Sequence, residues 1–221
     1  MNIYTIAGAN KAEFLANVKD VISTSMNGIL QYANEDDENI WFSIVGSAKY
    51  VRFYVSGTDP NYSVYVYLTN QPTGTGYIDT FGSGYKLIYL LKMQGGEVAI
   101  TGSLASEPIG YFNLKLHNLI TGYDYIGYVV GGFGAIYIED SKKGVYTSDH
   151  LVMVYSGSRL SKTFYPFMFK ISNDEIWLVQ NFLCCFSYFG LYKKMLYNGK
   201  YYRCVQGANN AKVAYYIKDG E

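Results

Sequence analysis

Tyrosine alternates with aliphatic residues along two stretches of the chain. Residues 50–55 read Tyr-Val-Arg-Phe-Tyr-Val, and residues 64–68 read Val-Tyr-Val-Tyr-Leu. A period of two places successive side chains on opposite faces of a β-strand, so the pattern predicts strands at residues 49–55 and 63–69. The turn-forming residues 56–61 between them predict a connection that brings the two strands together.

The remaining sequence continues in the same manner, with short apolar runs separated by turn-forming residues. The most specific of these signals is Asn198-Gly199, which lies between two strand-like runs and is typical of a type I′ hairpin, because both central residues need positive φ. Besides the two tyrosine-rich strands, we predict strands at residues 29–33, 40–45, 77–80, 85–93, 97–102, 111–119, 125–130, 135–138, 144–147, 151–155, 164–171, 176–179, 194–197, 200–205 and 212–218.

One segment near the N-terminus has a helical period instead. Asn10 is a favourable N-cap and Glu13 follows three residues later, as in a capping box. The apolar residues that follow occupy one stripe of a helix, and a run of polar residues and Asn27-Gly28 then ends it. The stripe consists of Phe14, Leu15, Val18, Val21 and Ile22.

These elements together predict a mainly β protein. We expect antiparallel sheets arranged as a β-sandwich or barrel, with one short amphipathic helix at the N-terminus. The glycine-rich residues 131–134 suggest a boundary between residues 1–130 and 131–221, although a corner inside one continuous domain fits the sequence equally well.

Composition narrows the function classes. The formal net charge is zero, which removes the usual electrostatic argument for nucleic-acid binding and favours self-association, so we expect a homo-oligomer. The sequence shows neither a signal peptide nor a long apolar span, and we expect no membrane insertion. The three cysteines include an adjacent pair, which is a poor basis for disulfides and fits a reducing cytoplasm.

Catalytic, metal and cofactor motifs are weak throughout. His117 and His150 fit solvent-side or loop positions, and Cys184-Cys185 lacks the spacing of a zinc site and fits small buried residues. The acidic residues 35–38 lack the pattern of a calcium loop. Nucleotide and nucleophile motifs are missing. We therefore expect no enzyme, no cofactor and no metal, with a polysaccharide hydrolase as a weaker alternative.

The 25 tyrosines are the strongest functional signal. A tyrosine ring buries apolar area while its hydroxyl keeps a hydrogen-bond partner, which suits both protein interfaces and sugar-binding surfaces. Plain packing inside the chain accounts for more than half of them in our interpretation. The candidate interface or glycan contacts are Tyr54, Tyr62, Tyr65, Tyr67 and Tyr77.

The tyrosine- and glycine-rich short strands, the neutral charge and the terminal hairpin at residues 197–205 resemble bacteriophage virion proteins of the tail, baseplate and fibre type. The resemblance implies a structural subunit that is made in the host cytoplasm, assembles into a virion and contacts other virion or tail subunits through tyrosine-rich strands. The alternative is a lectin-like module of a tail fibre that binds a host cell-surface glycan or receptor.

Overall fold

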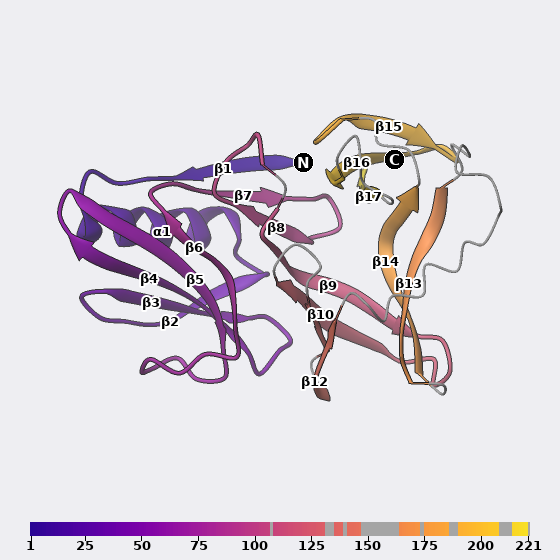
Figure 1. The fold of residues 1–221 in the computed structure, drawn as a ribbon, viewed down its shortest axis with the longest axis horizontal. Coiled ribbons are helices and arrows are strands. Elements are labelled where there is room, and N and C mark those ends of the chain that lie inside the picture. Colours follow the sequence, from indigo (N-terminus) through magenta and orange to yellow (C-terminus); the bar gives the residue numbers. More distant parts are fainter. Residues whose placement is uncertain are drawn as a thin grey trace.

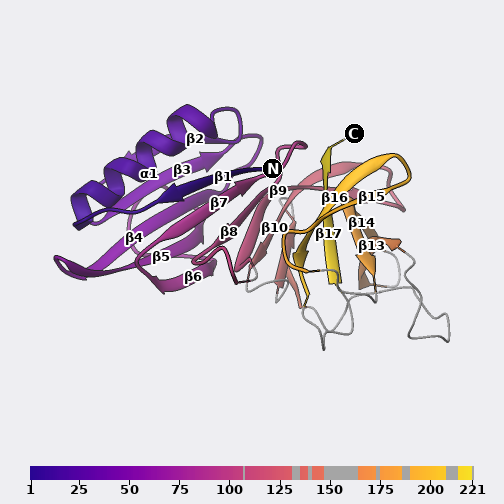
Figure 2. The same ribbon diagram turned by 90° about the horizontal axis from the view of Figure 1, so that it is seen from above.

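The computed structural model describes residues 1–106, 108–130, 135–138, 141–146, 164–172, 175–185, 190–207 and 214–220. Within them the protein is mainly β, with an antiparallel curled sheet, a second sheet and one helix near the N-terminus, as predicted (Figures 1 and 2). The predicted strand at residues 151–155, the glycine run 131–134 and His150 lie outside the described residues. The division of the chain at residue 130 stays a prediction.

The helix α1 (Lys11–Ser25) begins and packs as its sequence indicates. The Asn10 side chain accepts a hydrogen bond from the Glu13 backbone N–H at 2.8 Å, and the helix buries Phe14, Val18 and Ile22. These three side chains recur every four residues and face the core between the two sheets. The helix packs against the first strand, β1 (Asn2–Ile6), and against the smaller sheet (Figure 2).

The smaller sheet is a five-stranded antiparallel meander in chain order. Its strands are β2 (Leu30–Glu35), β3 (Asn39–Ile44), β4 (Tyr50–Thr58), β5 (Asn61–Thr69) and β6 (Asp79–Tyr85). The two tyrosine-rich strands β4 and β5 pair over their whole length, from Tyr50 opposite Thr69 to Thr58 opposite Asn61. The predicted turn at residues 56–61 is therefore mostly strand, and the hairpin loop shrinks to Asp59 and Pro60.

The larger sheet contains twelve strands and curls around a second core. Its main path runs through β1 (Asn2–Ile6), β7 (Ile88–Lys92), β8 (Val98–Thr101), β9 (Gly110–Asn118), β14 (Glu175–Cys185), β17 (Ala214–Gly220), β16 (Lys200–Gln206) and β15 (Lys194–Tyr197). Off this path lie β10 (Asp124–Val130), β11 (Ala135–Ile138), β12 (Ser141–Tyr146) and β13 (Phe164–Ser172). The strand β1 has no counterpart in the sequence-based prediction, because its alternation is short and mostly exposed.

Strand β8 is covered on both faces and so separates the two main cores. Val98 and Ile100 face the core shared with α1 and the smaller sheet, whereas Ala99 faces the core built with β13, β14 and β17. A strand buried on both sides reads as a continuous apolar run rather than an alternation. The two ends of the molecule in Figure 1, indigo to magenta and orange to yellow, are therefore joined through buried strands.

The terminal hairpin is confirmed in detail. β15 and β16 pair in the register expected for a two-residue loop, with Tyr197 opposite Lys200. Asn198 and Gly199 both have positive φ, 50° and 75°, as a type I′ turn requires.

Candidate functional site

The candidate site lies on the outer face of the smaller sheet. Along β5, Val64, Val66 and Leu68 point into the core, so the residues between them point outward. Tyr65 and Tyr67 occupy this outer face and are partly buried. On β4, Arg52 and Tyr54 lie directly opposite Tyr67 and Tyr65, respectively, and share the same face.

Four of the five predicted tyrosines come together here as a continuous row of rings, which we call the tyrosine surface: Tyr54, Tyr65, Tyr67 and Tyr77. The ring centroids of Tyr54 and Tyr65 are 5.7 Å apart, and those of Tyr65 and Tyr67 are 6.2 Å apart with planes only 7° from parallel. Tyr77 reaches the row from the loop after β5 and stacks on Tyr67 at 4.7 Å. Tyr77 is 59% exposed, so the row ends in an accessible ring.

Tyr62 does not belong to this surface. It lies on β5 an odd number of residues from Tyr65 and Tyr67, and the alternation of the strand turns it to the core face. Its ring packs against Phe14 of α1, and its hydroxyl donates to the Gly8 carbonyl at 2.7 Å. Tyr62 thus contributes to the core and anchors the segment before the helix.

Arg52 is the residue that the sequence-based search missed. Its guanidinium carbon lies 4.5 Å from the centroid of Tyr67 and 5.7 Å from that of Tyr54, within the range of cation–π attraction. Only 4% of the residue is exposed. Burial lowers the pKa of Arg52, whereas the neighbouring tyrosines Tyr67 and Tyr54 act in the opposite direction. The alternation Arg52–Tyr54 on one strand was the signal that could have revealed it.

Trp41 extends the same row onto β3. It pairs with Arg52 in the register of the sheet, on the face opposite the apolar Ile40 and Phe42. Its side chain is nevertheless buried, with 1% exposed. The row across the sheet therefore reads Trp41, Arg52, Tyr67, and something other than the core covers its buried end.

The loop 70–77 provides that cover. The Pro72 carbonyl accepts a hydrogen bond from Asn34 Nδ2 at 2.9 Å, and the Gly74 carbonyl accepts one from Arg52 Nη1 at 2.8 Å. Gly74 adopts φ +73°, a conformation that glycine reaches without strain. The loop thus folds back across the outer face and delivers Tyr77 onto Tyr67.

Two hollows flank Tyr77. One, of about 390 Å³, is lined by the loop itself, from Asn70 and Gln71 to Gly76 and Tyr77. The other, of about 330 Å³, lies between this loop and β11 and is lined in part by Lys49 and Tyr137. Both combine an aromatic ring with amide and carbonyl groups, which is the lining expected of a site for a small polar ligand.

The mixed lining includes ordered polar contacts. Lys49 Nζ donates to Asn70 Oδ1 at 2.7 Å, at the boundary that the two hollows share. Tyr137 Oη donates to Asp79 Oδ2 at 2.7 Å, which joins β11 to the start of β6. Burial raises the pKa of Tyr67, so its hydroxyl stays protonated at neutral pH and can donate a hydrogen bond.

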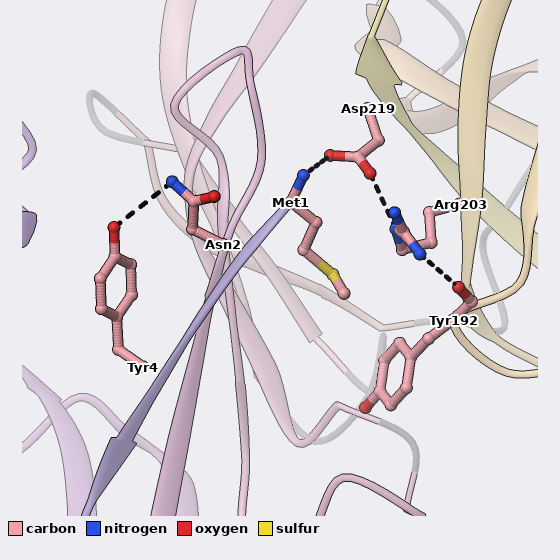
Figure 3. Close-up of polar contacts among 6 residues, drawn as sticks. All are labelled: Met1, Asn2, Tyr4, Tyr192, Arg203 and Asp219. Atoms are coloured by element: carbon pink, nitrogen blue, oxygen red, sulfur yellow. Dashed lines mark hydrogen bonds and ion pairs between the residues drawn. The ribbon is translucent and has the colours of Figure 1, made fainter.

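A second polar cluster connects the beginning and the end of the described chain. Figure 3 shows the Met1 amine paired with the Asp219 carboxylate of β17, whose second oxygen accepts from Arg203 Nε at 2.8 Å. Arg203 also donates from Nη1 to the Tyr192 carbonyl at 2.8 Å. Asp219 is buried, and the Met1 amine and Arg203 balance its negative charge, so this cluster holds strands together.

The other residues that the sequence analysis considered for catalysis or metal binding are accounted for by their contacts or burial. His117 Nδ1 lies 2.8 Å from Asp124 Oδ1 at the partly exposed β9–β10 pair. The three cysteines form no disulfide and are buried, and burial raises the pKa of Cys184 to about 11, which keeps the thiol protonated. Of the acidic residues 35–38, Glu35 is the last residue of β2 and pairs with Lys19 at 2.8 Å, while residues 36–38 form the β2–β3 hairpin loop. Among the described residues, no group of acidic, histidine and cysteine side chains could hold a metal ion.

In the part of the chain that the structure describes, no helix combines the length and apolar character needed to cross a membrane. The comparisons of this sequence with protein families and with curated proteins gave no match.

Proposed function

We propose that this protein is a non-enzymatic glycan-binding module of the tail-fibre or lectin type, and that the tyrosine surface with its two hollows is the binding site. The observation that carries the proposal is the position of Tyr77. Its exposed ring stands between two hollows, on top of a stack of partly buried rings.

The geometry suits a sugar for two physical reasons. A sugar ring has apolar C–H faces that pack on aromatic rings, and hydroxyls that need donors and acceptors at its rim. Tyr77 supplies an exposed ring backed by Tyr67, while Asn70 and the carbonyls of the loop 70–77 supply polar groups beside it. The rings are held by mutual stacking and by Arg52, so little side-chain freedom remains to be lost on binding.

The setting of this activity is also a proposal. Neutral charge, abundant tyrosine and a resemblance to phage-like virion proteins favour a subunit that is made in the host cytoplasm and carried on a virion. Its ligand would then be a host cell-surface glycan, and its role would be attachment of the virion to the host.

Glycan-array binding followed by calorimetry tests the proposal. Tyr77→Ala should weaken binding at least about tenfold, which corresponds to about 1.4 kcal/mol of lost contact. The matched control is Tyr201→Ala, because Tyr201 is also an exposed tyrosine but lies on β16, where Lys194 is 4.0 Å from its ring centroid. Failure of the unmodified protein to bind any glycan, or equal losses in both variants, would contradict the proposal.

A second candidate function, assembly with other virion subunits, is favoured by the tip of the β9–β10 hairpin. Leu119, Ile120 and Tyr123 are 45%, 60% and 66% exposed there, on the side of the molecule away from the tyrosine surface. The tip is ordered, because Asn118 Oδ1 accepts from the backbone N–H groups of Ile120 and Thr121, both at 2.9 Å. An ordered exposed apolar tip is a suitable protein contact.

Solution mass tests this second candidate. If the tip joins subunits, the protein should be oligomeric at micromolar concentration, and Ile120→Ser should lower its mass. The same substitution should leave glycan binding unchanged, because the tip lies outside the site. A strictly monomeric protein at these concentrations counts against assembly through this tip.

A further inference from the structure

Two hydrogen-bond donors under the loop 70–77 have no acceptor among the described residues. They are Trp41 Nε1 and Arg52 Nε, and both atoms are buried. The two residues are direct cross-strand neighbours on β3 and β4, so their side chains stand side by side on the outer face. A buried donor without a partner is costly, and two adjacent ones point to a shared acceptor.

The required acceptor is anionic. Arg52 is a cation, and one of its other donors, Nη1, is met only by the neutral Gly74 carbonyl. A carboxylate offers two oxygens in a plane, which suits a guanidinium better than a single carbonyl does. It could accept from Arg52 Nε with one oxygen and from Trp41 Nε1 with the other.

A ligand that reaches these donors would have to displace part of the loop above them. Residues 73–77 are all exposed, and a side chain at Gly74 would meet no atom within 4 Å. The contact to be replaced is the hydrogen bond between the Gly74 carbonyl and Arg52. Gly74 and Tyr77 also line the larger hollow, so a group that displaces this carbonyl comes from the proposed sugar site.

We propose that the glycan recognised by this site is acidic, with a sugar carboxylate bound by Arg52 and Trp41 while its ring packs against Tyr77. This inference rests on the proposed glycan-binding function and narrows its ligand to uronic or sialic acid-containing sugars. Lys49 adds to the preference for an acidic ligand, because it places a second cation at the neighbouring hollow. A free inorganic anion would satisfy the donors but would leave the rings uncovered.

Matched acidic and neutral probes test the inference by calorimetry. Trigalacturonate is compared with its methyl ester, and sialyllactose with its methyl ester, so that charge changes while the sugar rings are kept. We expect an acidic probe to bind at least about tenfold more tightly than its neutral partner. Arg52→Met should remove this preference, and Lys194→Met, which deletes a cation held over a tyrosine ring elsewhere in the protein, should keep it.

A second variant covers the case in which Arg52→Met does not fold. Trp41→Phe keeps an aromatic side chain, although a smaller one, and removes the Nε1 donor, so it should reduce the preference for the acidic probe by several-fold while circular dichroism stays native. Equal binding of acidic and neutral probes would overturn the acidic-ligand inference and leave glycan binding standing. Binding of none of the four probes or of any arrayed glycan would overturn both.

Discussion

The strand β5 carries tyrosines on both faces, and this arrangement permits a direct separation of stability from binding. Tyr62 faces the core at 2% exposure, whereas Tyr65 faces outward on the tyrosine surface. We predict that Tyr62→Ala lowers the free energy of unfolding far more than Tyr65→Ala does, although the residue type and the strand are the same.

The magnitude follows from what each ring contacts. Removing a buried aromatic ring costs about 3–5 kcal/mol, and the hydrogen bond from Tyr62 to the Gly8 carbonyl adds about 1 kcal/mol. Tyr65 loses only its contacts with Tyr54 on the neighbouring strand and with Tyr67 on its own strand, and such surface pairs are worth about 1 kcal/mol at most each. Since domains are stable by about 5–15 kcal/mol, the first change removes a large part of the total.

Urea unfolding followed by far-ultraviolet circular dichroism measures both variants, and an unchanged dependence on urea concentration confirms that the free energies are comparable. Tyr62→Phe serves as an intermediate control, because it keeps the ring and loses only the hydrogen bond, at about 1 kcal/mol. A loss for Tyr65→Ala as large as that for Tyr62→Ala would refute the reasoning, since the outer face would then be packed core.

Three further predictions concern stability. Asp219→Asn should lower the free energy of unfolding by about 3–5 kcal/mol, because it leaves the buried Met1 amine and the partly buried Arg203 without a carboxylate, whereas Glu35→Gln at the exposed pair with Lys19 should have a much smaller effect; equal losses in urea unfolding would contradict this contrast. The pKa of Cys184 is raised to about 11 in the folded protein, against an ordinary value of 9.0. As pH rises, the Cys184 thiol therefore loses its proton in the unfolded chain before it does in the folded protein, so stability should fall from about pH 9 to pH 11. Cys184→Ala should flatten that decline in urea midpoints, and an unchanged slope would exclude the thiol as its cause. Gly199→Ala should cost about 1 kcal/mol in thermal unfolding, because φ +75° is unfavourable for alanine; a neutral effect would mean that the hairpin tolerates another turn.

The sequence determined the elements whose signals are local. The cap at Asn10 and the apolar stripe of α1, the alternation along β4 and β5, and the turn at Asn198 and Gly199 each depend on residues only a few positions apart. Such features follow from backbone geometry, and the predicted antiparallel β fold with one helix is confirmed by the structure. The strand β1 escaped because it is stabilised by pairing with the distant β7 rather than by a pattern of its own.

The site depended on the tertiary structure. The alternation of β5 could show that Tyr65 and Tyr67 share a face, but only the position of α1 decides which face is core, and hence why Tyr62 is buried. Local sequence did not mark Trp41 and Arg52 as a pair, because strand register makes them neighbours and the loop 70–77 folds over that part of the sheet. Local periodicity fixes the direction of a side chain along its own strand, whereas its burial and charge partners come from segments that fold over it from elsewhere in the chain.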